Sequence, residues 1–397
     1  MSAILPGATL GVVGGGQLGR MLVHAAQRMG YLTAVLDPDA DSPAGRVSHH
    51  HIHTDYTDID GLARLAGLAD AITTEFENVP APSLEHLAVA RPVRPGAAAV
   101  AIAQDRVREK SHFVSCGVDC APYAVIETDE QMALVPPNLL PGILKTARLG
   151  YDGKGQQRVS DREELAAAWE SAGQVPCVLE KLMPLDYECS VIVARGQDGQ
   201  VVHFPPQRNL HRNGILAVTE VHAQNIPEAP ARLAVNSAIA IAEGLQYVGV
   251  LCVEFFVLSD GSLVVNEMAP RPHNSGHWTL DACDVSQFEL QVRTLAGLPL
   301  TAPRQHSPAL MLNLLGDLWF PDVDTAGAPR GAQAPVEPRW ADVLALPGAH
   351  LHLYGKAGAR RGRKMGHLTL TGDDIEQVRS TADFAAALLG LPIPLSE

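Results

Sequence analysis

The sequence predicts a multidomain protein with α/β and α+β parts, on three observations. Strand and helix patterns alternate through the first hundred residues, which is typical of a parallel sheet with helices on both faces. Further along, Ser259-Asp260-Gly261-Ser262 separates two apolar stretches, as in a β-hairpin. The last hundred residues hold short strand patterns and a closing helix, which indicates a β-rich C-terminal part.

The alternation of strand and helix patterns gives expected positions for most helices and strands. In the N-terminal part, strands are expected at 9–13, 32–36 and 71–76, and helices at 17–29, 59–68 and 98–116. A small α+β module follows, with strands at 123–126, 143–147 and 177–182 and a helix at 163–172. The stretch 188–221 reads as strands with a turn at 211–214, followed by helices at 231–244 and 285–296. The last strands are expected near 310–315, 349–355 and 366–371, before a helix at 374–389.

The composition is that of a globular protein, with 46% hydrophobic and 19% charged residues. A formal net charge of −14 and no long basic run argue against a nucleic-acid-binding surface. We expect no membrane span, because no apolar run reaches roughly 18 residues, and we see no signal peptide. The six cysteines lack zinc-site spacing, so we expect reduced thiols in a cytoplasmic protein.

Two glutamates of the hairpin are predicted to face each other. Asp260-Gly261 is expected to form a two-residue type I′ turn closed by Ser259 and Ser262, because this pair tolerates positive φ. Equal steps back along both strands then bring Glu254 opposite Glu267. Two carboxylates opposed among apolar neighbours repel each other, and Mg²⁺ bound to both would offset that repulsion. The alternative is a solvated face, or a pair bridged by lysine or arginine.

A lysine and a glycine-rich segment have the chemistry of a phosphate site. Lys145 lies on an expected strand and precedes the loop Gly150-Tyr151-Asp152-Gly153-Lys154-Gly155-Gln156. Backbone N–H groups of such a loop can fold over a polyphosphate, although the pattern is neither a P-loop nor a kinase loop. An ordinary hairpin turn is the alternative. The order of lysine, glycine loop, acidic strand at 180–183 and carboxylate hairpin favours a nucleotide site.

In this order of features the chain resembles the ATP-grasp superfamily. Three runs narrow the resemblance to the N5-carboxyaminoimidazole ribonucleotide synthetases: Gly14-Gly15-Gly16-Gln17-Leu18-Gly19-Arg20; Asn266-Glu267-Met268-Ala269-Pro270-Arg271-Pro272-His273-Asn274-Ser275-Gly276-His277; and Tyr354-Gly355-Lys356 before Gly362-Arg363-Lys364-Met365-Gly366-His367. The resemblance covers nearly the whole chain. It implies an ATP-grasp fold with a Rossmann-like pre-ATP-grasp domain at 1–105, small and large grasp lobes at 106–185 and 186–300, and a β-rich C-terminal domain at 301–397.

The resemblance implies a carbon–nitrogen ligase of de novo purine biosynthesis. Such an enzyme uses ATP and bicarbonate, through carboxyphosphate, to carboxylate the amine of 5-aminoimidazole ribonucleotide. The cofactors implied are ATP and Mg²⁺, for which Mn²⁺ can substitute. The partners implied are these small molecules, a second copy in a homodimer, and the downstream mutase for product hand-off. Neither nucleic acid nor membrane is implied.

The resemblance also implies roles for individual residues. Those expected to bind ATP are Arg106, Lys145, Gly150, Tyr151, Asp152, Gly153, Lys154, Gly155, Gln156, Glu180, Lys181, Leu182, Met183, Glu188, His211, Asn266 and Glu267. Those expected to bind the ribonucleotide are Gly16, Gln17, Leu18, Glu75, Tyr151, Asp152, Arg271, His273, Asn274, Lys356, Arg363 and Lys364. Glu254 and Glu267 are expected to hold the metal, and Lys145, Glu267 and Arg271 to carry catalysis.

The second hairpin strand departs from the superfamily pattern. Many ATP-grasp enzymes carry Glu-x-Asn there, whereas this chain has Ala269 in the third position. Asn266 precedes Glu267 and is expected to point to the opposite face, so we assign it a nucleotide contact rather than a metal bond. Arg271 would share the face of Glu267 if alternation continued, where its guanidinium could bind bicarbonate or the transferring phosphoryl group. A surface ion pair is the alternative for Arg271.

Other patterns leave alternatives open. Gly14-x-Gly16-x-x-Gly19 followed by Asp37 matches a dinucleotide fingerprint, so an NAD-dependent oxidoreductase remains an alternative. A formate-dependent ribonucleotide transformylase and a non-catalytic nucleotide-binding module are two more. The histidines at 49, 50, 51 and 53 are more simply explained as a polar strand edge than as a metal site.

Overall fold

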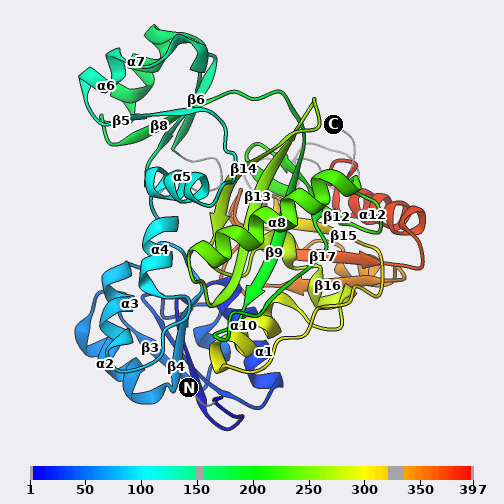
Figure 1. Cartoon of the computed structure of the whole chain (residues 1–397). Coiled ribbons are helices and arrows are strands. Elements are labelled where there is room, and N and C mark those ends of the chain that lie inside the picture. Colours follow the sequence, from blue (N-terminus) through cyan, green and yellow to red (C-terminus); the bar gives the residue numbers. More distant parts are fainter. Residues whose placement is uncertain (1–2, 149, 151–154, 321–334, 395–397) are drawn as a thin grey trace.

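The computed structural model describes residues 3–148, 150, 155–320 and 335–394. Within these ranges the chain forms three sheets: one parallel sheet of four strands, one antiparallel sheet of four strands and one sheet of nine strands. Figure 1 shows the parallel sheet at the lower left, the small antiparallel sheet in a lobe at the upper left, and the large sheet in the body.

The N-terminal domain confirms the predicted parallel sheet. Its elements are β1 (Thr9–Val13), α1 (Gln17–Arg28), β2 (Leu32–Asp37), β3 (His50–His53), α2 (Ile59–Leu68), β4 (Ala71–Thr74) and α3 (Ala81–Ala88). The strand order is β3-β2-β1-β4. All five residues of β1 are buried, because helices cover both faces of the sheet. Helix α3 was not predicted.

The long helix predicted at 98–116 is wrong, because two helices occupy that stretch. They are α4 (Ala97–Ala103) and α5 (Arg106–Ser115). Asp105 separates them as the N-cap of α5, and its Oδ1 accepts hydrogen bonds from the N–H groups of Val107 and Arg108 at 3.1 and 3.3 Å. This cap makes Arg106 the first residue of α5, where its side chain reaches the hairpin.

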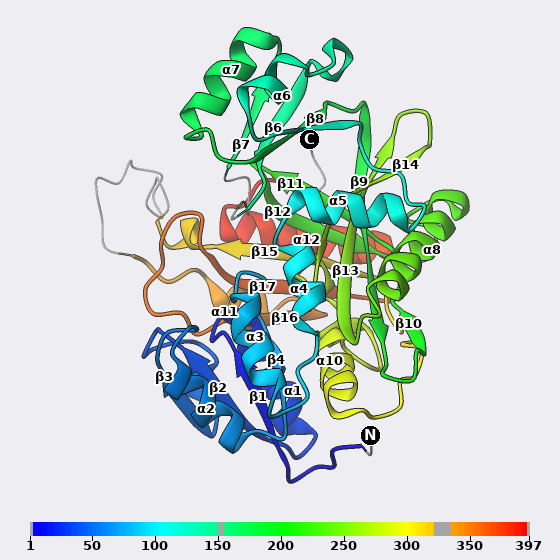
Figure 2. The same cartoon turned by 60° about the vertical axis from the view of Figure 1, so that its left-hand side comes forward.

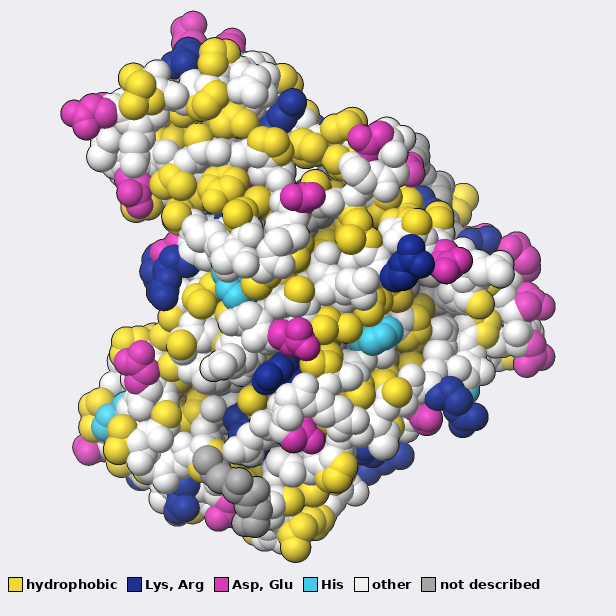
Figure 3. Space-filling model, viewed as in Figure 1, with side chains coloured by type: hydrophobic (Ala, Val, Ile, Leu, Met, Phe, Trp, Pro, Cys, Tyr) yellow, Lys and Arg dark blue, Asp and Glu magenta, His cyan; other side chains and the backbone are white. Residues whose placement is uncertain are grey.

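The small lobe is the α+β module expected from the sequence. It consists of β5 (Tyr123–Ile126), α6 (Asp129–Ala133), β6 (Gly142–Thr146), β7 (Gln156–Val159), α7 (Arg162–Ser171) and β8 (Cys177–Lys181). Trp169, Leu179 and neighbouring apolar residues give the lobe a core of its own. The lobe stands apart from the body in both views (Figures 1 and 2). In Figure 3 an indentation separates it from the rest of the surface.

The large sheet extends across the body. Its strands are β9 (Leu185–Arg195), β10 (Val201–His203), β11 (Gln207–Arg212), β12 (Ile215–Val221), β13 (Gly249–Leu258), β14 (Leu263–Ala269), β15 (Ala309–Leu315), β16 (Ala349–Leu353) and β17 (Lys364–Thr371). The order is β14-β13-β9-β11-β12-β15-β17-β16, with β10 paired to β9. The predicted C-terminal strands therefore extend the sheet that contains the hairpin. The four-part division of the chain stays a prediction.

Helices cover this sheet and join it to the N-terminal domain. They are α8 (Glu228–Gly244), α9 (Thr279–Ala282), α10 (Gln287–Ala296), α11 (Trp340–Leu344) and α12 (Ile375–Leu389); single 3₁₀ turns lie at Gly45–Val47, Pro137–Leu139, Asn274–Gly276 and Gly316–Trp319. Ala234, Ala238 and Ile241 of α8 pack into the core with β9 and β13. Phe288 and Val292 of α10 share a core with α1. No helix of the described chain has the length and apolar character needed to cross a membrane.

The hairpin β13–β14 confirms that Glu254 lies opposite Glu267, but the turn used to predict it is wrong. The loop has three residues, 259–261, and is closed by the N–H of Leu258 and the carbonyl oxygen of Ser262, 2.8 Å apart. This loop shifts the register by one residue, and a β-bulge at Asn266 shifts it back. The two irregularities cancel at the glutamates.

Candidate active site

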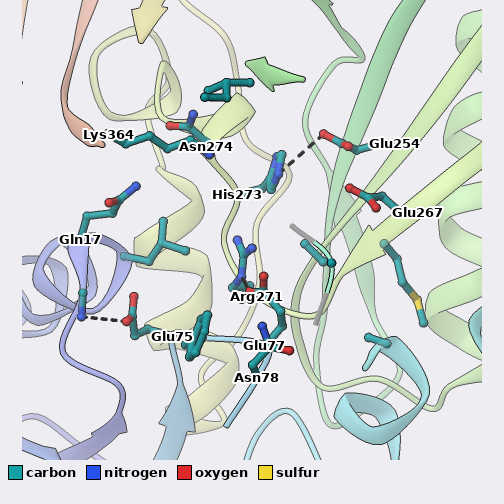
Figure 4. Close-up of a pocket in the computed structure, with 18 of the residues that line it drawn as sticks. Gln17, Glu75, Glu77, Asn78, Glu254, Glu267, Arg271, His273, Asn274 and Lys364 are labelled. Atoms are coloured by element: carbon teal, nitrogen blue, oxygen red, sulfur yellow. Dashed lines mark hydrogen bonds and ion pairs between the residues drawn. The ribbon is translucent and has the colours of Figure 1, made fainter. Parts of the chain in front are cut away.

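A cleft of about 800 Å³ lies between the N-terminal domain, the hairpin and the loop that connects β16 to β17. That volume suits a small-molecule ligand. Figure 4 shows Glu254 and Glu267 at one end, Gln17 and Lys364 at the other, and Arg271 between them. The predicted residues that line it are Gly16, Gln17, Leu18, Glu75, Arg106, Gly150, Glu254, Glu267, Arg271, His273, Asn274, Lys356, Arg363 and Lys364.

The two glutamates differ in their surroundings. Burial raises the pKa of Glu254 to about 7, and the charge of Glu267 adds to the rise. Burial alone would raise the pKa of Glu267, but Arg106 and Lys145 outweigh it and lower this pKa. Arg106 Nη1 donates to Glu267 Oε2 at 3.0 Å, while 40% of the Glu267 side chain stays exposed in the cleft. Near neutral pH, Glu254 is therefore partly protonated, whereas Glu267 is ionised.

Histidines stand beside these carboxylates. Burial and the neighbouring Arg271 hold the pKa of His273 well below its usual value, and its Nε2 lies 3.6 Å from Glu254 Oε1. His211 differs: burial lowers its pKa, but Glu188, whose Oε2 lies 2.7 Å from His211 Nδ1, outweighs burial and raises it. The carboxylate end thus combines fixed negative charge with one imidazole kept neutral.

Lys145 connects the small lobe to the hairpin. Its Nζ donates to Glu180 Oε2 at 3.0 Å and to Asn266 Oδ1 at 3.3 Å. Lys110, on α5, pairs with the other oxygen of Glu180 at 3.1 Å. The expectation that Asn266 faces away from Glu267 is therefore wrong, because as the bulge residue it escapes strand alternation and points toward Lys145.

Arg271 lines the cleft for a different reason than expected. Strand β14 ends at Ala269, so alternation does not carry Arg271 onto the face of Glu267 and that premise is wrong. Its Nε instead pairs with Glu77, and its Nη1 donates to the carbonyl oxygen of Pro272 at 3.1 Å. The ion pair with Glu77 holds the guanidinium between the two ends of the cleft (Figure 4).

Basic groups gather at the far end. Lys356 Nζ donates to Gln17 Oε1 and, at 2.6 Å, to the carbonyl oxygen of Lys364. Arg363 donates to the carbonyl oxygens of Ala357 and Gly358 at 3.1 and 3.2 Å. Nearby, both side-chain polar atoms of Asn274 are buried without a hydrogen-bond partner in the described structure. A buried amide with both atoms unsatisfied is suited to bind a polar ligand.

The glycine turn before α1 is occupied by the protein's own carboxylates. Glu75 accepts from the N–H groups of Gly16 and Gly19 at 2.7 and 3.1 Å. Asp37 accepts from the N–H of Gly15 at 2.6 Å. These N–H groups are the ones a dinucleotide pyrophosphate would need, so the structure does not favour the NAD-dependent oxidoreductase.

The remaining predicted residues lie elsewhere or outside the described residues. Lys145, Gln156, Glu180, Lys181, Leu182, Met183, Glu188, His211 and Asn266 lie on β6, β7, β8, β9, β11, β14 or the segment after β8, beyond the lining of this cleft. Gly155 precedes β7 with a φ of +70°. Tyr151, Asp152, Gly153 and Lys154 lie outside the described residues.

Several lining residues were missed by the sequence analysis: Glu77, Asn78, Gln104, Glu109, Arg360 and Arg361. Glu77 and Asn78 follow the carboxyl end of β4, where ligands of parallel sheets bind, so that rule could have found them. Glu109 follows Arg106 by one helical turn and accepts from the N–H of Met268 at 2.8 Å. Burial raises the pKa of Glu109 to about 8, so this carboxyl is largely protonated near neutrality.

Three family models match the chain in the order of its domains. They are the ribonucleotide synthetase preATP-grasp domain at 7–104, the ATP-grasp domain at 111–288 and the phosphoribosylaminoimidazole carboxylase C-terminal domain at 309–381. Together they define an ATP-grasp enzyme.

Relatives with known names narrow the class. The N5-carboxyaminoimidazole ribonucleotide synthase of Brucella melitensis is 44% identical over 372 residues, which is 93% of this chain and 97% of the relative. That of Bacillus subtilis is 40% identical over 92% of each chain. The chain belongs to the N5-carboxyaminoimidazole ribonucleotide synthase family of carbon–nitrogen ligases.

Solved structures agree with this assignment. The Staphylococcus aureus N5-carboxyaminoimidazole synthetase complexed with ADP has a TM-score of 0.85 and 36% identity, covering 98% of this chain and 99% of that chain. The Aspergillus clavatus N5-carboxyaminoimidazole synthase in complex with ADP and 5-aminoimidazole ribonucleotide has a TM-score of 0.84 and 30% identity, covering 96% and 98%. The predicted ATP-grasp fold is confirmed.

Proposed function

We propose that this chain uses ATP and bicarbonate to carboxylate the amine of 5-aminoimidazole ribonucleotide, giving N5-carboxyaminoimidazole ribonucleotide in de novo purine biosynthesis. One observation carries the proposal: a single cleft joins a carboxylate pair, an anchored arginine and a basic phosphate-sized end. The formate-dependent transformylase is not favoured, because the relatives from Brucella melitensis and Bacillus subtilis, which match along nearly the full chain, are N5-carboxyaminoimidazole ribonucleotide synthases.

Glu254 and Glu267 are the residues that would hold Mg²⁺, or Mn²⁺ in its place. Their direct opposition and the raised pKa of Glu254 support this, because an uncompensated carboxylate pair favours a cation. A bound ion would neutralise charge on the ATP phosphates. Asn266 bonds Lys145 rather than approaching the pair as a third ligand, which supports leaving the metal to two carboxylates, phosphate oxygens and water.

The polyphosphate would lie between Lys145, Arg106 and the glycine loop around Gly150 and Gly155. Lys145 and Arg106 already neutralise Glu180 and Glu267, so an incoming phosphate would share these cations. Phosphoryl transfer needs such positioning and charge neutralisation more than covalent help. The segment after β8, with Lys181, Leu182 and Met183, is assigned to the adenine, and Glu188 with His211 to the ribose side.

The ribonucleotide would occupy the other end of the cleft. Its 5′-phosphate would meet Lys356, Arg363 and Lys364, and its polar groups would meet Gln17, Glu75 and the unsatisfied amide of Asn274. The other ribonucleotide contacts assigned are Gly16, Leu18, Tyr151, Asp152 and His273. Both halves of the reaction would then share one enclosed space.

The chemistry follows from this placement. A bicarbonate oxygen attacks the γ-phosphorus of ATP, and ADP leaves, which gives carboxyphosphate. The ribonucleotide amine then bonds to the activated carbon and loses a proton, the bond from that carbon to the phosphate oxygen breaks, and inorganic phosphate leaves. Arg271, held by Glu77 between the two ends, would bind the bicarbonate or the transferring phosphoryl group.

ADP release tests the proposal when ATP, bicarbonate and 5-aminoimidazole ribonucleotide are supplied together and then omitted in turn. We expect rapid turnover only with all three, and formation of the carboxylated ribonucleotide. Full activity with formate in place of bicarbonate would instead support the transformylase. ATP binding without turnover would support a non-catalytic module.

Location and assembly belong to the same proposal. Six unpaired cysteines suit a reducing compartment, which supports a cytoplasmic protein. A homodimer and product hand-off to the downstream mutase rest on the family resemblance alone. Sedimentation of the purified chain, alone and with the mutase, measures both.

A further inference from the structure

A group of histidines lies away from the cleft, on the last two strands of the large sheet. His352 of β16 pairs directly with His367 of β17, and their rings stack with centroids 4.5 Å apart and planes 13° apart. Asp281 of α9 packs beside them, with Oδ2 2.9 Å from His352 Nε2. One ligand atom from each of the three residues lies within 4.8 Å of the others, and no other such group occurs among the described residues.

His367 has an unused buried nitrogen. Its side chain is 0% exposed, and its Nδ1 lies 3.0 Å from the Tyr354 hydroxyl. Its Nε2 has no hydrogen-bond partner in the described structure. A buried polar atom left without a partner costs free energy, so its retention calls for an explanation. A metal bond to Nε2 would provide one.

The Tyr354 hydroxyl supports that bond. When Nδ1–H of His367 donates to the Tyr354 oxygen, the lone pair of the ring remains on Nε2. Ligating histidines usually donate their other ring N–H in this way, which fixes the ring and the tautomer.

An ion can reach this group from solvent. The His352 side chain is 31% exposed and that of Asp281 is 11% exposed. His350, two residues before His352 on the same face of β16, places its Nδ1 3.8 Å from Asp281 Oδ1 and can supply a further ligand. Zinc bonds of about 2.0–2.2 Å require the ligand atoms to close in, and the His352 ring, now stacked on His367, would have to turn so that a nitrogen of each ring points at one ion.

We propose that Asp281, His352 and His367 form a second metal site, distinct from the carboxylate pair, for a divalent transition-metal cation of the zinc type. Two imidazoles and one carboxylate suit zinc, cobalt or nickel, whereas Mg²⁺ prefers oxygen ligands. The ion would tie α9 to β16 and β17. The loop between these strands carries Lys356 and Arg363, so the site would brace the basic end of the cleft from behind.

The first test is zinc binding by calorimetry to the chelator-treated full chain, with saturating Mg²⁺ and ADP to occupy the carboxylate pair. We expect one zinc equivalent that Mg²⁺ does not displace. His352→Gln and Asp281→Asn should each lower its affinity by about 100-fold or more, because losing a direct ligand exceeds the roughly 10–100-fold cost of losing an outer partner. Displacement by Mg²⁺, or unchanged affinity in both variants, overturns the proposal.

Matched controls separate this site from adventitious histidine binding. His49→Gln/His53→Gln removes two exposed histidines of the N-terminal domain and should leave the zinc equivalent intact; its loss there overturns the proposal. Tyr354→Phe keeps every ligand and should weaken zinc by about 10-fold through the orientation of His367. Anomalous scattering at the zinc edge from a crystal of the wild-type chain should peak between His352 and His367. A peak only at the His49–His53 strand, or none, contradicts the site whether or not the variants fold.

Discussion

Two cross-strand pairs stand at opposite edges of the same nine-stranded sheet. Glu254 of β13 faces Glu267 of β14, and His352 of β16 faces His367 of β17 at the other edge. The glutamates are surrounded by compensating cations, with Arg106 and Lys145 lowering the pKa of Glu267. The histidines need no such charges, because burial keeps His367 neutral.

The sequence alone points to a cation site at the glutamate edge but gives no such sign at the histidine edge. Opposed carboxylates are unfavourable by themselves, so their presence on one hairpin already points to a cation. Opposed histidines cost little and look like ordinary packing. The histidine pair suggests a metal site only once the structure shows Asp281 beside it and the Nε2 of His367 without a partner in the described structure.

The largest effect should come from the carboxylate edge. Glu267→Gln keeps the shape of the side chain but removes the charge that would hold Mg²⁺, so kcat for ADP release should fall by about 10²–10³-fold. Glu243→Gln, on the exposed face of α8, is the matched control and should stay near wild type. An equal fall in kcat for His352→Gln would show that the two edges do not differ in their role in catalysis.

The loop behind the histidine edge gives the next effect. Lys356→Met should raise the KM for 5-aminoimidazole ribonucleotide by about 10–100-fold, because a charge-assisted hydrogen bond to phosphate contributes about 1.5–3 kcal/mol. The KM for ATP should change little, and Lys356→Arg should restore part of the loss. Equal increases in both KM values would show that Lys356 supports the whole cleft rather than one substrate.

The raised pKa of Glu254 predicts a stability that falls as pH rises, opposite in sign to the effect of the lowered pKa of His367. Its folded pKa of about 7 exceeds the usual 4.5, so its stabilising contribution is complete at low pH and is lost as pH rises through about 7. Without metal, Glu254→Gln should therefore raise Tm relative to wild type at about pH 8 but not at about pH 5. Saturating Mg²⁺ should reverse the difference at high pH, and a Tm gain that does not depend on pH would contradict the assignment.

Sequence reasoning succeeded where local chemistry decides the structure. The strands β1 and β5 and the helix α2 match their predicted bounds because their apolar patterns are continuous and their ends are marked. It failed for contacts between residues far apart in the sequence. Glu77, the partner of Arg271, lies 194 residues away, and no local pattern around either residue predicts the contact. The Asp105 cap was readable but was overridden by the long apolar pattern around it.

The smallest expected effect comes from the turn of the hairpin. It distinguishes a two-residue from a three-residue loop as the reason that the glutamates face each other. A two-residue type I′ turn places both Asp260 and Gly261 at positive φ, whereas in this structure Gly261 has a φ of +81° and Asp260 is not among the positive-φ residues. Gly261→Ala should therefore cost about 1 kcal/mol of unfolding free energy, measured by urea denaturation.

Asp260→Ala separates the two turns. In the three-residue loop it should lose only the hydrogen bonds from Ser262 to Asp260 Oδ1, at 2.9 Å from the backbone and 2.6 Å from the hydroxyl, and these exposed bonds contribute less than the strain at Gly261. A two-residue turn would make both substitutions equally costly, because each would force alanine to positive φ. Unequal costs would mean that the glutamates face each other through a three-residue loop whose register shift is corrected by the bulge at Asn266.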